Sequence, residues 1–157
     1  FPDASRSVPV GAYDTAWRPA YEHGFDVAMA RLAALAAGGR GGSGEGGEGG
    51  DGGEGGGAFD GVIGFSQGAA MALLVPGARW AVLLSAIPPP RGRGPSTGRR
   101  DARPSLHVYD AAEPHAHLCR RVEASFEGPA VVRHGEGHAV PRAEAATREM
   151  VRFVERV

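Results

Sequence analysis

Residues 59–75 read FDGVIGFSQGAAMALLV, passing from an apolar run through a glycine-flanked serine into small, helix-favouring residues. The apolar run at residues 59–65 predicts a short buried strand, and residues 67–75 predict a helix that ends before Pro76. Between the two lies a G-x-S-x-G motif made of Gly64, Phe65, Ser66, Gln67 and Gly68. A strand before this motif and a helix after it are typical of a nucleophile elbow, the tight turn that carries a reactive serine.

The elbow interpretation assigns a task to each residue of the motif. Gly64 and Gly68 would relieve the crowding that Cβ atoms create on a strained turn. The turn would expose the Ser66 hydroxyl at the carboxyl end of the strand and aim the Gln67 backbone N–H at a developing oxyanion. A plain tight turn without chemistry is the alternative, because short Gly/Ser motifs also occur by chance.

Strands and helices are predicted to alternate along the rest of the chain. Apolar runs predict strands at residues 80–86, 106–109 and 130–134, and helices are expected at 16–37, 117–126 and from Pro141 onward. The last helix is expected to line one face with Ala146, Met150, Val154 and Val157. Such alternation is typical of an α/β domain with a mostly parallel sheet.

A glycine-rich segment at residues 38–57 holds fourteen of the chain's 26 glycines. It cannot bury enough apolar surface to offset the entropy of ordering it, which predicts a flexible insertion. It does not match a phosphate-binding loop, because no strand precedes it and no GK[ST] closes it. The other residues suffice for one core, so residues 1–157 are predicted to form a single domain that carries this insertion.

Charge, apolar pattern and cysteine content argue against a nucleic-acid-binding protein, a membrane-spanning protein and a disulfide-stabilised protein. Seventeen basic residues, all arginine, face 18 acidic residues, and the arginines at 91–103 lack the interleaved aromatic residues of a nucleic-acid-binding surface. No apolar run approaches the roughly 20 residues that span a bilayer. The single cysteine, Cys119, excludes an internal disulfide framework and favours a reducing compartment, so a cytoplasmic location is expected.

A reactive serine needs a general base, which lies downstream of it in an elbow-bearing fold. His138 stands in a loop, H-G-E-G-H, after the last predicted strand, and it is the predicted base. The other downstream histidines have different predicted places: His107 within a strand, His115 and His117 at a solvated helix start, and His134 at the end of the last strand. No zinc motif is predicted, because the two glycines of the loop discourage the helix that would align its histidines.

Two carboxylates, Asp110 and Glu113, follow the predicted strand at 106–109, and either could accept the Nδ1–H bond of His138. Asp110 comes directly after the strand, whereas Glu113 lies three residues further on, where the chain reverses. The residues alone leave the choice open. The carboxylate that is not used is expected to be a solvated turn residue.

Four segments in chain order resemble the FSH-type serine hydrolases: FDGVIGFSQGAAMALL, LLSAIPPP, PSLHVYDAAEP and VVRHGEGHAVP. This small α/β-hydrolase group stands near the acyl-protein thioesterases and carboxylesterases. The resemblance implies an α/β-hydrolase-like three-layer sandwich, with Ser66 as nucleophile and His138 as base. It also favours Glu113 over Asp110, since the acid of the family usually follows a strand as G-x-x-D and Glu113 occupies the aspartate's position.

The resemblance also implies an activity. The expected reaction is cleavage of a small-molecule carboxylic ester or thioester with an apolar acyl chain, through an acyl-enzyme and without cofactor or metal. These hydrolases open with a strand and an HG-type loop that supplies a second oxyanion donor, and no such segment precedes Phe1. An N-terminally truncated fold is therefore expected, and a catalytically impaired binding module is the alternative function.

Overall fold

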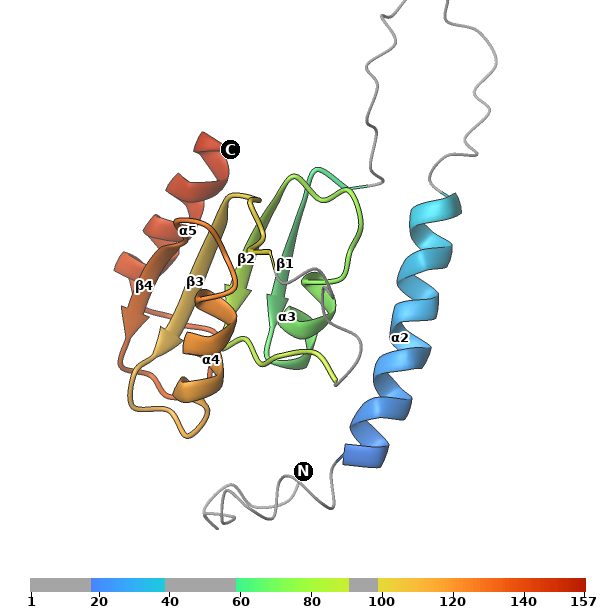
Figure 1. The fold of residues 1–157 in the computed structure, drawn as a ribbon. Coiled ribbons are helices and arrows are strands. Elements are labelled where there is room, and N and C mark those ends of the chain that lie inside the picture. The colour runs from blue at the N-terminus through green and yellow to red at the C-terminus, as the bar shows by residue number, and fades with distance from the viewer. Residues whose placement is uncertain (1–17, 39–58, 91–98) are drawn as a thin grey trace, which may run out of the picture.

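The computed structural model describes residues 18–38, 59–90 and 99–157 (Figure 1). Residues 39–57 of the predicted insertion lie outside the described residues, as do residues 91–98 of the arginine-bearing stretch at 91–103. Helix α2 (Arg18–Gly38) precedes the predicted insertion, and its Phe25 is buried. None of the described helices combines the length and apolar character needed to cross a membrane.

Four parallel strands form a sheet in the order in which they occur along the chain. The strands are β1 (Gly61–Phe65), β2 (Trp80–Leu84), β3 (Ser105–Asp110) and β4 (Ala130–His134). The helices that follow β1, β3 and β4 are α3 (Gln67–Ala72), α4 (Ala116–Glu123) and α5 (Glu144–Arg156). The predicted α/β class is confirmed, and because the strands run in one direction, their carboxyl ends share one edge of the sheet.

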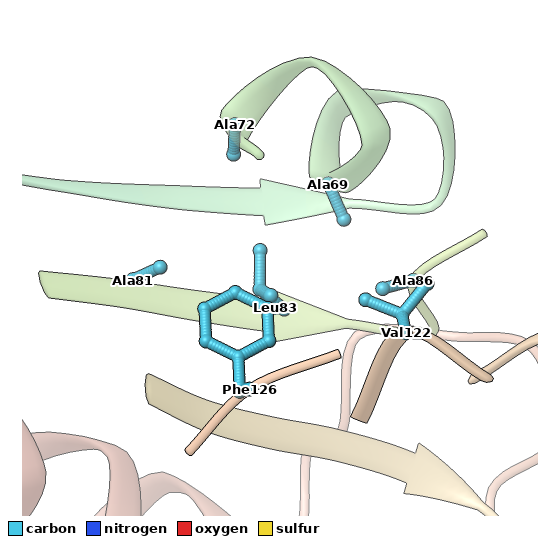
Figure 2. Packing of buried hydrophobic residues seen from close by; sticks show 7 residues of the cluster. All are labelled: Ala69, Ala72, Ala81, Leu83, Ala86, Val122 and Phe126. Atoms are coloured by element: carbon cyan, nitrogen blue, oxygen red, sulfur yellow. The ribbon is translucent and has the colours of Figure 1, made fainter. Parts of the chain in front are cut away.

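Helices cover both faces of the sheet, α3 and α4 on one side and α5 on the other (Figure 1). Alternate residues of β2 supply the two cores. Leu83 packs with residues of α3 and α4, whereas Val82 packs with Phe153 of α5. Figure 2 shows Ala69 and Ala72 of α3 beside Leu83. Small side chains on α3 allow the helix to approach the strands closely, which gives the elbow at its N-terminus a rigid support.

Helix α3 is shorter than predicted, since it ends at Ala72 and does not continue to Val75. The N–H groups of residues 74 and 75 bond to carbonyls three residues back, so the last turn is tighter than an α-helix. The Arg103 guanidinium donates to the Leu73 carbonyl at 3.1 Å. A cation is favourable at this end of a helix, because the last carbonyls lack helical partners and carry partial negative charge.

The buried face of helix α5 differs from the predicted one in the last turn. Phe153 is 5% exposed, whereas Val154 and Val157 are each 37% exposed. At 3.6 residues per turn, positions 153 and 154 both lie close to the face that begins with Met150, and the larger apolar surface of Phe153 takes the buried place. The predicted face is therefore right for Ala146 and Met150 and wrong for the last turn.

His107 packs within β3, as predicted, with its Nε2 3.2 Å from the Ser105 hydroxyl and its ring 5.0 Å from that of Phe126. Burial lowers the pKa of His107 to about 4, well below the ordinary value near 6.5. As the pH falls below about 6.5, the unfolded chain therefore binds a proton here before the folded chain does. The free energy of unfolding is expected to decrease between about pH 6.5 and pH 4, by up to roughly 3 kcal/mol.

Replacement of His107 by glutamine is expected to remove this part of the acid sensitivity, because glutamine has no proton to bind. Urea unfolding at neutral and acidic pH, for the wild type and for His107→Gln, measures the effect. The exposed His117→Gln serves as the matched control and should lose stability on acidification as the wild type does. An equally steep loss in His107→Gln would contradict the assignment.

Candidate active site

Ser66 lies at the turn between β1 and α3, where the sequence predicts a nucleophile elbow. Its backbone has φ 54° and ψ −114°, a region that residues other than glycine rarely occupy. Its N–H donates to the Leu84 carbonyl at 2.9 Å, and its carbonyl accepts the N–H groups of Ala69 and Ala70. Such strain persists only where the surroundings fix it, so the turn presents the serine in one defined orientation at the carboxyl edge of the sheet.

Close packing of the turn requires glycine at position 64 but not at position 68. A Cβ atom on Gly64 would lie 2.5 Å from the Gly68 carbonyl oxygen and 2.6 Å from the Ala69 nitrogen. A Cβ atom on Gly68 would meet no atom of the described residues within 4 Å. The expectation that both glycines relieve crowding is therefore right for Gly64 and wrong for Gly68.

Alanine at Gly64 is expected to lower the free energy of unfolding by about 1–3 kcal/mol, because β1 and α3 must separate to admit the methyl group. Gly68→Ala adds the same methyl group in open space and is expected to remain close to the wild type. Thermal unfolding followed by circular dichroism compares the two variants. Equal midpoints would show that the close approach at Gly64 does not limit the turn.

The loop after β4 carries His138 and is hydrogen-bonded to the end of β3. Gly137 adopts φ 70°, which glycine reaches without strain. Its N–H donates to Asp110 Oδ2 at 2.7 Å, so the residue directly before His138 is fixed to the neighbouring strand. The ring of His138 then packs against that of Phe65, with 5.1 Å between ring centroids.

A second set of hydrogen bonds connects the same loop to the residues just before α5. The Glu136 carboxylate accepts the backbone N–H groups of Arg142 and Ala143 at 3.0 Å each, and these bonds lower the pKa of Glu136. Helix α5 starts just after these hydrogen-bonded residues, at Glu144, and not at Pro141 as predicted. The sequence does not predict this role of Glu136, because an acidic residue between two glycines resembles an ordinary solvated loop residue.

Ser66, His138 and Glu113 are in contact in series. His138 Nε2 lies 3.1 Å from Ser66 Oγ, and His138 Nδ1 lies 2.8 Å from Glu113 Oε2. The three residues follow β1, β4 and β3, respectively, so they meet at the shared carboxyl edge of the sheet. A hydroxyl, an imidazole and a carboxylate in this order can transfer a proton from the hydroxyl to the imidazole while the carboxylate orients the ring.

The two candidate carboxylates have different surroundings. The Glu113 side chain is fully buried beside His138, whose own side chain is 32% exposed. Asp110 accepts the N–H groups of Ala112 at 2.8 Å and Gly137 at 2.7 Å, and these bonds lower the pKa of Asp110. Asp110 is only 9% exposed, so it is not the solvated turn residue expected of the unused carboxylate. The geometry pairs Glu113 with the imidazole and gives Asp110 a place in bracing the loop.

The other histidines at positions 115, 117 and 134 differ in their surroundings. His134 ends β4, as predicted, and its Nδ1 accepts the Glu136 N–H at 3.2 Å. His117 is exposed. His115 is half-buried rather than solvated, because its ring packs on that of His138 with 5.6 Å between centroids, and burial lowers its pKa. Within the part of the chain that the structure describes, no group of three His, Cys, Asp or Glu residues could hold a metal ion.

Two residues for which the sequence predicts no part in the site contact Glu113. The Ser85 hydroxyl, after β2, donates to Glu113 Oε2, and the Cys119 thiol, on α4, donates to Oε1; each bond is 2.9 Å long. Ser85 could have been anticipated, since the carboxyl ends of adjacent parallel strands meet and Ser85 follows the strand next to β1. No sequence signal marks Cys119, whose contact depends on how α4 packs against the turn after β3.

Among curated proteins, the chain is similar to esterases. It is 33% identical over 119 residues to Esterase OVCA2 of Bos taurus, and 32% identical over 115 residues to Esterase OVCA2 of Homo sapiens. Each alignment covers 63% of this chain and 50% of the relative. Esterase FPY3 of Fusarium mangiferae is 29% identical over 125 residues, covering 64% of this chain and 57% of its own. The chain thus spans about half the length of the curated relatives it matches.

Among solved structures, a carboxylesterase of Bacillus cereus matches with a TM-score of 0.41 and 19% sequence identity, covering 60% of this chain and 49% of that one. A family model described as Serine hydrolase (FSH1) matches residues 24–150. This match extends over most of the chain and includes Ser66, Glu113 and His138. The chain therefore belongs to the FSH1 family of serine hydrolases.

Proposed function

We propose that this chain is a hydrolase that cleaves carboxylic esters or thioesters through an acyl-enzyme on Ser66. The observation that carries the proposal is the series of contacts from Glu113 through His138 to Ser66, at 2.8 and 3.1 Å. Membership of a serine hydrolase family supports hydrolysis as the reaction class. The relatives named as esterases favour carboxylic esters as the substrates.

The first half of the proposed reaction transfers the acyl group to the protein. Ser66 Oγ attacks the carbonyl carbon while His138 Nε2 takes the hydroxyl proton, and Glu113 stabilises the imidazolium. The backbone N–H of Gln67 has no acceptor within α3, because Gln67 is the first residue of that helix, and it is the proposed donor to the oxyanion. The imidazolium then protonates the leaving alcohol or thiol as its bond to the acyl carbon breaks.

The second half returns the protein to its starting state. A water molecule gives a proton to His138 and attacks the acyl carbon on Ser66. The imidazolium returns that proton to Ser66 Oγ as the acyl bond breaks, and a carboxylic acid leaves. Water is the only co-reactant in this balance, so the proposed cycle draws on no cofactor.

The neighbours of His138 and the cysteine content indicate a class of substrate and a location. Phe65 lies beside the His138 ring and provides an apolar neighbour for a bound acyl group, which favours small molecules with apolar acyl chains. The same proton transfers serve an alcohol or a thiol leaving group, so thioesters belong to the proposal as well. The single cysteine favours a reducing compartment, and a cytoplasmic location is part of the proposal.

Hydrolysis of p-nitrophenyl esters with short and long acyl chains, beside matched acyl thioesters, tests this function. Rapid quenching followed by mass spectrometry should detect an acyl adduct in the wild-type chain and none in Ser66→Ala. Circular dichroism of both proteins controls for folding. The proposal fails if Ser66→Ala turns over at the wild-type rate. It also fails if the folded wild type binds esters without turnover, as a catalytically impaired binding module would.

A further inference from the structure

The Glu113 carboxylate is enclosed by hydrogen-bond partners from three separate segments. Oε2 lies 2.9 Å from the Ser85 hydroxyl and 2.8 Å from His138 Nδ1, and Oε1 lies 2.9 Å from the Cys119 sulfur. The side chain has no exposed surface, so water does not solvate it. A buried carboxylate depends on such partners, because an unsatisfied charged group in the interior is strongly unfavourable.

Ser85 occupies a backbone conformation that favours glycine. Its φ is 43°, and the residue is completely buried. Its N–H donates to the Val108 carbonyl at 2.8 Å, which fixes the backbone against β3, the strand that leads to Glu113. Glycine would adopt this φ without strain, so the serine at this position contributes a hydroxyl at the cost of backbone strain.

Cys119 meets the other oxygen from the first turns of α4. The residue is 1% exposed, and its N–H donates to the His115 carbonyl at 3.1 Å. Burial, together with the hydrogen bond to Glu113, raises the pKa of the Cys119 thiol. The sulfur therefore keeps its proton at neutral pH and acts as a donor to the carboxylate.

We propose that Ser85 and Cys119 are positioning residues that hold the Glu113 carboxylate in the orientation His138 requires. The inference rests on the proposed function, in which Glu113 orients the imidazole. With Ser85 on Oε2 and Cys119 on Oε1, the carboxylate has a donor at each oxygen, and rotation about its terminal bond breaks both contacts. Ser85 also shares Oε2 with His138, so it withdraws part of the negative charge that the imidazolium would otherwise receive.

Holding the carboxylate in orientation and withdrawing part of its charge predict different kinetic effects. Loss of the Ser85 hydroxyl should lower kcat about tenfold with KM nearly unchanged, since a hydrogen bond to a charged group is lost. The acid limb of the kcat/KM profile should move to higher pH, because Oε2 then stabilises the imidazolium more strongly. Cys119→Ala should lower kcat about threefold to tenfold, and Cys119→Ser should restore most of that loss because a hydroxyl also donates.

The experiment compares Ser85→Ala, Ser85→Gly, Cys119→Ala and Cys119→Ser in the full chain, using pH profiles of p-nitrophenyl ester hydrolysis. Ser85→Gly accommodates the φ of 43° and removes the hydroxyl even if the alanine variant folds poorly. Ser105→Ala is the matched control, since it removes another buried hydroxyl, which lies 3.2 Å from His107 and takes no part in the contacts of Ser66, His138 and Glu113. It should change stability alone. The inference is overturned if Ser85→Gly keeps the wild-type kcat and acid limb, or if Cys119→Ser is no better than Cys119→Ala.

Proton NMR separates this inference from the proposed function. The Nδ1 proton of protonated His138 should give a downfield resonance through its bond to Glu113. We expect this resonance to shift or broaden in Ser85→Gly and Cys119→Ala but not in Ser105→Ala. If the wild type shows no turnover, the proposed function fails while the resonance still tests the positioning. An unchanged resonance in every variant would overturn the positioning role whatever the activity.

Discussion

Alanine at Ser66 or at His138 is expected to lower kcat/KM for ester hydrolysis by roughly 10⁶-fold, the scale seen when a serine or histidine of a triad is removed. The hydroxyl and the imidazole act as one unit through their 3.1 Å contact, so neither is useful without the other. The double variant should therefore be no slower than either single variant. Steady-state kinetics with p-nitrophenyl esters measures all three proteins beside the wild type.

His134→Ala provides the control for this prediction. His134 lies at the end of β4, four residues before His138, and it bonds to the loop backbone rather than to Ser66. Its replacement should cost less than tenfold, as expected for loss of one loop hydrogen bond. A severe loss of activity in His134→Ala with a mild loss in His138→Ala would contradict the assignment of His138 as the base.

Replacement of Glu113 by glutamine is expected to lower kcat by about 10⁴-fold, which is the scale for an amide in place of the triad acid. The amide nearly preserves shape but carries no charge, so it neither stabilises the imidazolium nor selects the tautomer with Nδ1 protonated. The effect should fall on kcat more than on KM, because the charge matters most when the imidazolium forms.

Asp110→Asn is the matched change at the other candidate carboxylate. The amide side chain would keep an oxygen for one of the two backbone N–H groups that Asp110 now accepts, so part of the loop bracing survives. We expect a loss of about tenfold or less, from looser placement of His138. A loss at Asp110 as severe as that at Glu113 would contradict the pairing of Glu113 with the imidazole.

Local sequence was informative wherever chemistry and backbone geometry depend on neighbouring residues. The apolar run before Ser66 and the small residues after it were enough to predict a strand, a tight turn and a helix, and the structure has all three. The local pattern likewise predicts the H-G-E-G-H loop after the last strand, and the structure brings its second histidine to Ser66. The choice between Asp110 and Glu113 came from the family resemblance, because spacing alone does not say which carboxylate turns inward.

Features that depend on packing between distant segments cannot be predicted from sequence patterns. Phe153 and Val154 both lie near the predicted face of α5, and the packing of that helix against the sheet decides which of them is buried. Cys119 reaches Glu113 because α4 lies over the turn after β3, and no motif carries that information. Gly68 belongs to the elbow motif, yet there is open space where its Cβ atom would lie, so its place in the motif does not mean that a larger residue would clash.

Labelling with a fluorophosphonate, followed by peptide mapping, tests the central claim most directly, since the reagent reacts with a serine only when a base activates it. In the folded wild-type chain we expect one phosphonyl adduct, located on Ser66, and we expect its rate of formation to collapse in His138→Ala. The chain offers Ser85 and Ser105 as internal comparisons, and neither should be labelled. Absence of an adduct on Ser66 in folded protein, or labelling that persists at the same rate without His138, would contradict the account.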